Sequence, residues 1–109
     1  MGTVVELKSE DELNTYINSY KYCFLDFYAT WCKPCTLLSN FINDHVLKLR
    51  NNFIIVKINV DKFDTLSDKF EVDNIPHIVY YMNKEKQKIT FSYSTKEYFF
   101  DILNDNEKT

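Results

Sequence analysis

Apolar residues follow distinct spacings along this chain, and each spacing predicts a type of secondary structure. Runs that are apolar at almost every position, at 23–28 and 53–60, predict strands covered on both faces of a sheet. Shorter segments at 4–7, 78–82 and 89–93 predict three further strands. The chain therefore supplies five candidate strands, two of which are apolar enough to lie in the centre of a sheet.

Apolar positions three and four residues apart predict the helices between these strands. One helix opens at Ser9, where Glu12 three residues later completes a capping-box pattern. A longer helix is predicted after Cys35, and it ends near 51–52, where two Asn residues tolerate a left-handed backbone. A short helix is predicted at 65–71. The apolar stripe of the long helix consists of Leu38, Ile42, Val46 and Leu49.

The C-terminal part of the chain is predicted to form a hairpin and a last helix. The polar stretch 83–86 separates the strands at 78–82 and 89–93 and predicts the turn between them. Ser94 and Glu97 repeat the capping-box pattern ahead of the last helix. The resulting order, β-α-β-α-β-α-β-β-α, predicts an α/β fold with parallel pairing in the middle of the sheet and an antiparallel hairpin at one edge.

Length, composition and charge narrow the class of protein. A chain of 109 residues predicts a single domain over 1–109. Hydrophobic residues make up 45% and aromatic residues 17%, which is enough for a buried core without disulfide cross-links. The net charge of −3, with both signs interleaved, argues against a nucleic-acid partner, since such a partner favours a basic patch. No apolar run approaches the ~18 residues needed to cross a bilayer, so membrane insertion is not expected.

The candidate chemistry lies in the segment Cys32-Lys33-Pro34-Cys35, which follows a buried strand and opens the long helix. A helix N-terminus offers unpaired N–H groups and the positive end of the helix dipole, and both stabilise a thiolate. Cys32 lies closest to these groups and is predicted to be the nucleophile. Cys35, one turn into the helix, can then attack a mixed disulfide. Pro34 suits the first turn, where its missing N–H is no loss.

A Cys-x-x-Cys pair by itself is also compatible with a zinc site. A structural zinc ion needs four ligands, and the chain has no second cysteine pair. Only His45 and His77 remain as nitrogen ligands, and neither lies near the pair in the sequence. The ligand count therefore disfavours a metal, and no cofactor is expected.

Several segments of the chain resemble the thioredoxin family. The segment Asp26-Phe27-Tyr28-Ala29-Thr30-Trp31-Cys32-Lys33-Pro34-Cys35 is similar to the active-site segment of that family, and Ile75-Pro76 resembles its Ile followed by a cis-proline that faces the cysteines. Asp26 and Lys57 match the family's buried acid and its lysine partner. The resemblance covers nearly the whole chain and implies the thioredoxin fold, a mixed five-stranded sheet flanked by four helices.

Asp26 and Lys57 are charges inside otherwise apolar strands. A buried carboxyl is costly unless it is paired or protonated, and with a raised pKa it can exchange a proton with Cys35. Pairing with Lys57 would account for both intrusions. Two simpler interpretations stay open: Asp26 faces solvent on an edge strand, or Lys57 extends from a strand end into water.

The substrate groove is predicted to include Trp31, Lys33, Pro34, Ile75 and Pro76. Trp31 is expected to cover the cysteines and keep them partly dry. The resemblance implies a cis bond at Pro76, although the sequence alone favours trans. In the cis form the Ile75 backbone would pair with an extended substrate segment.

Four positions depart from the family pattern. Lys33 stands where thioredoxins usually carry Gly and places a cation beside the thiolate, and His77 stands where they carry Thr or another small residue. Lys84 replaces the hairpin Gly, and Ser92 replaces the Gly of the substrate-side loop, which puts broad substrate tolerance in doubt. His77 is interpreted as a half-buried structural histidine, with a catalytic role left open because its usual pKa lies near neutrality.

Two further residues receive structural interpretations. Cys23 falls within an apolar strand and is predicted to be a core residue. His45 is predicted to lie on the surface, or at its boundary, on the long helix.

The predicted function is thiol–disulfide exchange, with Cys32 attacking, Cys35 resolving, Asp26 transferring protons and Lys57 tuning Asp26. The resemblance implies a monomeric protein disulfide reductase that acts on disulfide-containing proteins and is reduced by a thioredoxin reductase, in the cytoplasm by default. An organelle or secretory compartment would apply if a targeting segment had been removed. One alternative is an oxidase or isomerase of a secretory compartment, since direction depends on potential. A second alternative is a scaffold or binding subunit with the same fold. A glutaredoxin is disfavoured, because no Gly-Gly follows Ile75-Pro76.

Overall fold

A computed structural model describes residues 2–45 and 52–87 of the chain. The strands are β1 (Thr3–Glu6), β2 (Tyr22–Tyr28), β3 (Phe53–Asn59), β4 (His77–Met82) and β5 (Glu85–Lys86). The helices are α1 (Asp11–Ser19), α2 (Lys33–His45) and α3 (Asp64–Lys69). The predicted segment 89–93, the last predicted helix, Ser92, and the predicted positions Val46, Leu49 and Asn51 lie outside the described residues.

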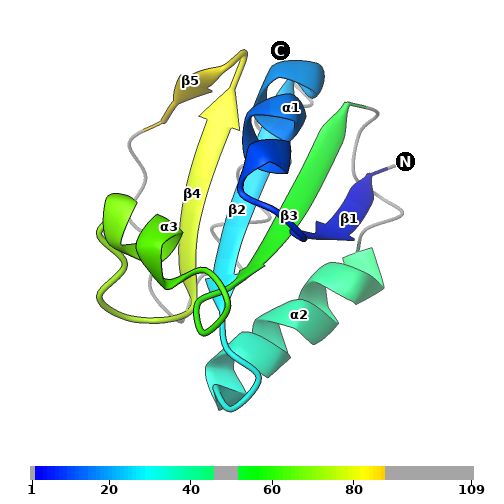
Figure 1. The fold of residues 1–109 in the computed structure, drawn as a ribbon. Coiled ribbons are helices and arrows are strands. Elements are labelled where there is room, and N and C mark those ends of the chain that lie inside the picture. Colours follow the sequence, from blue (N-terminus) through cyan, green and yellow to red (C-terminus); the bar gives the residue numbers. More distant parts are fainter. Residues whose placement is uncertain (1, 46–51, 88–109) are drawn as a thin grey trace.

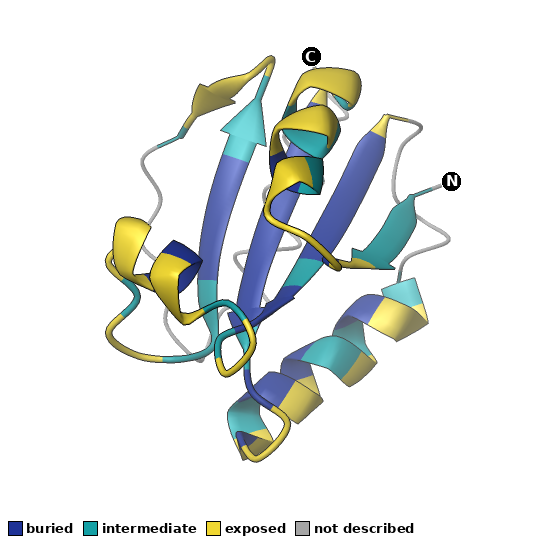
Figure 2. Cartoon of the chain, viewed as in Figure 1, coloured by how far each residue is buried: buried dark blue, intermediate teal, exposed yellow. Residues whose placement is uncertain are grey.

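The five strands form one mixed sheet in the order β1-β3-β2-β4-β5 (Figure 1). β3 pairs in parallel with both β1 and β2, whereas β4 runs antiparallel to β2 and to β5. The parallel centre and the antiparallel edge confirm the arrangement predicted from the order of elements. β2 and β3 are buried along almost their whole length, as Figure 2 shows, which agrees with their continuous apolar runs.

Alternate residues of the strands face two separate cores. One core packs beneath α2, and its buried members are Tyr22, Phe24, Leu38, Ile42, Phe53, Ile55, Ile78 and Tyr80. The other lies beneath α1 and α3 and contains Cys23, Leu25, Phe27, Ile54, Val56, Ile58 and Val79 with Leu13 and Leu66. The sheet is thus covered by α2 on one face and by α1 and α3 on the other (Figure 1).

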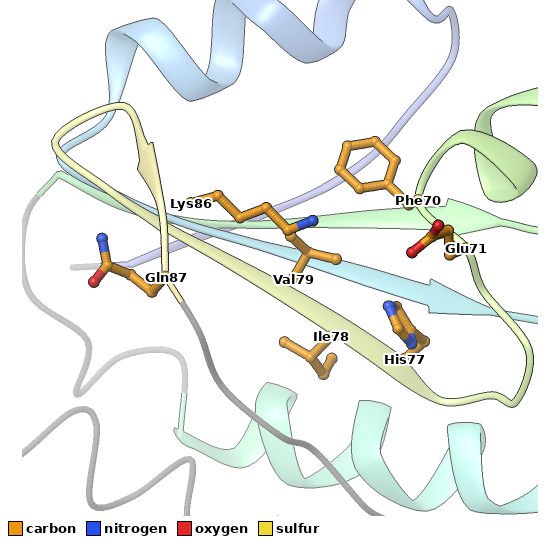
Figure 3. A pocket seen from close by; sticks show the side chains of 7 residues that line it. All are labelled: Phe70, Glu71, His77, Ile78, Val79, Lys86 and Gln87. Carbon is orange, nitrogen blue, oxygen red and sulfur yellow. The ribbon is translucent and has the colours of Figure 1, made fainter.

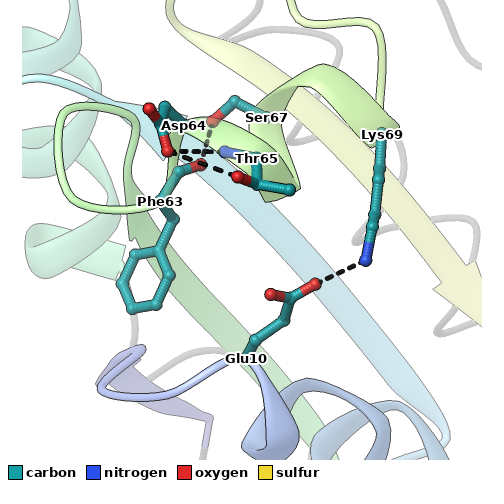
Figure 4. A network of polar contacts seen from close by, with 6 residues as sticks. All are labelled: Glu10, Phe63, Asp64, Thr65, Ser67 and Lys69. Atoms are coloured by element: carbon teal, nitrogen blue, oxygen red, sulfur yellow. Dashed lines mark hydrogen bonds and ion pairs between the residues drawn. The ribbon is translucent and has the colours of Figure 1, made fainter.

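The start of α1 uses half of the predicted capping box. The Ser9 backbone N–H donates to Glu12 Oε1 at 3.0 Å, but the Ser9 hydroxyl also donates to that carboxylate instead of capping the helix N-terminus. The helix begins at Asp11 with Glu10 as its N-cap, one residue later than the pattern predicts. Farther along, Lys69 Nζ at the end of α3 contacts Glu10 Oε1 at 2.8 Å and links the two helices of this face (Figure 4).

The β4–β5 turn is shorter than the sequence predicts. Asn83 and Lys84 have φ values of 53° and 70° and make the turn alone. Glu85 and Lys86, which were predicted to belong to it, already pair with Met82 and Tyr81 in the sheet. Both side chains are exposed, so this edge strand carries no apolar signal that would distinguish it from a turn.

Candidate active site

Cys32 and Cys35 are joined by a disulfide at the N-terminus of α2. Both residues are buried, and the Cys35 backbone N–H donates to Cys32 Sγ at 3.3 Å. This is the helix N-terminal donor that the sequence predicts for Cys32. Once the disulfide is reduced, a donor in this position favours a thiolate on Cys32.

The loop before β4 brings a backbone carbonyl to the same sulfur. The Ile75–Pro76 peptide bond is cis, as the family resemblance implied. The carbonyl oxygen of Ile75 lies 3.8 Å from Cys32 Sγ, although the two residues are 43 positions apart in the chain. The predicted neighbours Cys32 and Ile75 therefore meet at one site.

Trp31 directly precedes Cys32, and its predicted role in covering the cysteines stays a prediction. Its side chain is 70% exposed, and its Nε1–H donates to Asp61 Oδ2 at 2.9 Å. This hydrogen bond holds the indole in place at the surface, with its apolar ring exposed to solvent. Sequence reasoning missed Asp61, which directly follows the buried run 53–60, and its position after a strand end was the available signal.

Asp26 lies in the centre of the sheet and is 1% exposed, which excludes the solvent-facing interpretation. Within residues 2–45 and 52–87, neither of its carboxylate oxygens has a hydrogen-bond partner. Burial raises the pKa of Asp26 to about 7, with the Lys57 ammonium opposing the rise and the Glu6 carboxylate adding to it. A carboxyl with this pKa can both accept and return a proton near neutral pH.

Lys57 does not form the predicted direct pair with Asp26. The two residues are register partners on β3 and β2, but Lys57 Nζ donates to Ser39 Oγ at 2.8 Å. It also lies 4.4 Å from the centroid of the Tyr28 ring. In this position the ammonium avoids the desolvation that contact with the buried carboxylate would impose, so its effect on Asp26 acts through space.

A cavity of about 240 Å³ lies next to the disulfide, at Cys35. Its walls come from the end of β2, the first turns of α2 and Lys57 of β3, and they include Tyr28, Cys35 and Ser39. The cavity thus borders both Cys35 and Lys57.

The two histidines lie outside this cavity. His77 is half-buried, and its ring lies 5.9 Å from that of Phe27. It borders a different cavity, of about 220 Å³, with Glu71 and Lys86 (Figure 3). Burial, and secondarily the Lys86 charge, lower the pKa of His77. His45 lies at the end of α2, partly buried against Phe41.

Three other predicted positions are placed as follows. Cys23 is fully buried, which confirms it as a core residue, and burial raises its pKa to about 12. Lys33 is the exposed first residue of α2, and Pro34 occupies the first turn as predicted.

In the described part of the chain, no group of three or more His, Cys, Asp or Glu residues is arranged to hold a metal ion. None of the described helices has the length and apolar character needed to cross a membrane.

Comparison with known proteins agrees with this geometry. A thioredoxin family model matches residues 4–105. The thioredoxin of Buchnera aphidicola subsp. Baizongia pistaciae is 29% identical over 101 residues, which make up 93% of each chain. The thioredoxin structure from Trypanosoma brucei brucei matches with a TM-score of 0.85 at 16% identity, over 97% of this chain and 92% of that one. The Schistosoma mansoni thioredoxin pre-protein matches with a TM-score of 0.77 at 26% identity, over 93% and 98%.

Proposed function

We propose that this chain, which belongs to the thioredoxin family, reduces disulfides in protein substrates and takes its electrons from a thioredoxin reductase. As a thiol–disulfide oxidoreductase it works through the Cys32–Cys35 pair. The observation that carries the proposal is the position of this pair, with the Cys35 N–H directed at Cys32 Sγ on a helix N-terminus. That arrangement supports attack by the first cysteine and resolution by the second.

The reaction begins with the reduced pair. The Cys32 thiolate attacks one sulfur of a substrate disulfide, a Cys32–substrate disulfide forms, and the other substrate sulfur leaves as a thiolate that takes up a proton. Asp26 then accepts the proton of Cys35, whose sulfur attacks the Cys32 sulfur of the mixed disulfide, and the second substrate sulfur leaves as a thiolate that takes up a proton. Two electrons pass to the substrate, and the enzyme is left with the Cys32–Cys35 disulfide present in the structure.

Substrate binding is proposed for the rim of the site. The Ile75 carbonyl lies beside Cys32 Sγ, so an extended segment that pairs with the Ile75 backbone would bring its disulfide to the nucleophile. The exposed Trp31 indole, fixed by Asp61, would supply apolar contact to such a segment. Recognition of this kind depends on backbone and apolar area, which suits unrelated protein substrates.

An insulin-reduction assay with NADPH and a thioredoxin reductase tests the proposal. Wild type is expected to reduce insulin, and Cys32→Ser is expected to abolish the activity because the attacking sulfur is lost. A folded wild-type protein that leaves insulin oxidised would contradict the proposal and would favour a scaffold role. Reduction by dithiothreitol in place of the reductase separates a failure of the donor from a failure of the chemistry.

A further inference from the structure

The Lys57 ammonium is placed between two acids by the strand register. Glu6 of β1 and Asp26 of β2 are both register partners of Lys57 on the intervening β3. Neighbouring strands lie roughly 4.8 Å apart, so the four-carbon stem of Lys57 is long enough to bring Nζ to either carboxylate. Coulomb attraction alone would favour such a contact.

The ammonium nevertheless pairs with neither acid. Within the described ranges, no ion pair joins Lys57 to Glu6 or to Asp26. Its hydrogen bond goes to the Ser39 hydroxyl on α2, at 2.8 Å, and its charge lies over the Tyr28 ring. Both partners are uncharged, and both line the cavity next to Cys35.

The Tyr28 ring is itself fixed from β1. Its hydroxyl donates to the Glu6 carboxylate and lies 2.8 Å from each of the two oxygens. Burial, together with the bond to Glu6, raises the pKa of Tyr28, so the hydroxyl keeps its proton and remains a donor. The Glu6 carboxylate is thus hydrogen-bonded to Tyr28, and Lys57 contacts the Tyr28 ring and Ser39 instead.

We propose that Ser39 is a positioning residue, whose hydroxyl holds the Lys57 ammonium away from the Asp26 carboxyl. Without this hydrogen bond, Lys57 would move toward Asp26, where the buried carboxylate has no other partner. An ammonium at contact distance would stabilise the charged form and weaken Asp26 as a base for the Cys35 proton. The kinetic consequence rests on the proposed function, whereas the placement of Lys57 does not.

The other groups that face Asp26 do not account for the same effect. The charged or titratable groups that act on it are Lys57 from β3, Glu6 from β1 and Tyr28 from its own strand. On α2, Cys35 borders the same cavity as Lys57. β4 offers apolar Ile78 at the register position. Ser39 carries no charge, so its removal changes the field at Asp26 only if another group moves.

The test is a pH titration of the Asp26 carboxyl carbon by NMR in the oxidised protein. Ser39→Ala is expected to lower the Asp26 pKa by roughly one unit, because Lys57 is released toward the carboxylate. Ser39→Thr keeps the hydroxyl and is expected to restore the wild-type value. Asn40→Ala alters the same cavity but leaves the Lys57 hydrogen bond in place, so it should not shift the titration.

A Lys57→Met background shows whether the effect passes through the ammonium. In that background Ser39→Ala is expected to leave the Asp26 pKa unchanged. An unchanged pKa in the single variant, or an equal shift in both backgrounds, would overturn the proposal. The rate of mixed-disulfide resolution is measured in parallel as a function of pH. If the carboxyl titration shifts and this profile does not, Ser39 still positions Lys57, and the proton-transfer role of Asp26 is wrong.

Discussion

Asp26 is the residue whose environment is least compatible with its charge. It is an acid within a strand that is buried on both faces, and its pKa of about 7 lies well above the ordinary value of 3.8. Since the folded pKa is the higher one, the charged form opposes folding. The cost is absent below the unfolded pKa, grows as the pH rises toward 7, and stays constant above it at roughly 4 kcal/mol.

Asp26→Asn is therefore expected to raise the free energy of unfolding at about pH 8, because the buried charge is lost. The gain should shrink toward about pH 4, where the wild-type carboxyl is neutral. Urea unfolding of wild type and variant at the two pH values measures the gain in the free energy of unfolding at each pH. A variant that is no more stable than wild type at the higher pH would contradict an unfavourably buried carboxylate.

Cys23 provides a second prediction at the residue scale. It is fully buried, and its raised pKa keeps the thiol protonated, so it lacks both access and nucleophilicity. In the reduced native protein, a thiol reagent should label Cys32 rapidly and Cys23 only after unfolding. Peptide mapping of the labelled sites checks this outcome. Labelling of Cys23 in the native protein would place that thiol at the surface.

The sequence identified residues whose chemistry is unusual for their position, but it did not identify their partners. Asp26, Lys57 and the two active-site cysteines interrupt apolar or regular patterns and could be recognised directly. Ser39, Glu6 and Asp61 are ordinary polar residues at exposed or half-exposed positions. Their roles arise from contacts made across the fold, such as that between Ser39 and Lys57, and these contacts leave no local pattern.

At the scale of elements, the apolar runs predicted β1, β2, β3 and β4 to within one residue at each end, because buried strands leave a continuous apolar signal. Helix and turn ends were less predictable. The sequence placed Lys86 in the hairpin turn, but β5 is an edge strand whose side chains are exposed, so backbone pairing alone defines it. The start of α1 also differs from the prediction, because the Ser9 hydroxyl donates to the Glu12 carboxylate instead of capping the helix.

The β4–β5 turn carries the prediction at this scale. Lys84 adopts a φ of 70°, a left-handed conformation that costs a residue with a Cβ about 1 kcal/mol and costs Gly almost nothing. Lys84→Gly is expected to raise Tm by a few degrees. Lys86→Gly makes the same change two residues later, within β5, and is expected to lower Tm instead. A destabilising Lys84→Gly would show that this turn does not hold the left-handed conformation.

At the scale of the whole molecule, the fold brings together segments that are distant in sequence. Cys32 comes from the N-terminus of α2, the Ile75 carbonyl from the loop before β4, and the Asp26 carboxyl from the centre of β2. The order of elements was sufficient to predict the mixed sheet, since parallel central strands require helical connections. The single domain over 1–109 and the last helix stay predictions, because they involve residues that the structure does not describe.

In the proposed reaction, Cys32 attacks substrates and Cys35 resolves the mixed disulfides. The most direct test incubates Cys35→Ser and, separately, Cys32→Ser with disulfide-containing protein substrates and maps any mixed disulfide by mass spectrometry. Cys35→Ser is expected to accumulate substrates joined to Cys32, because attack proceeds and resolution cannot. Cys32→Ser is expected to accumulate none. The opposite result would be substrates joined through Cys35 in the Cys32→Ser protein, with none on Cys32 in the Cys35→Ser protein. It would show that Cys35 attacks and Cys32 resolves.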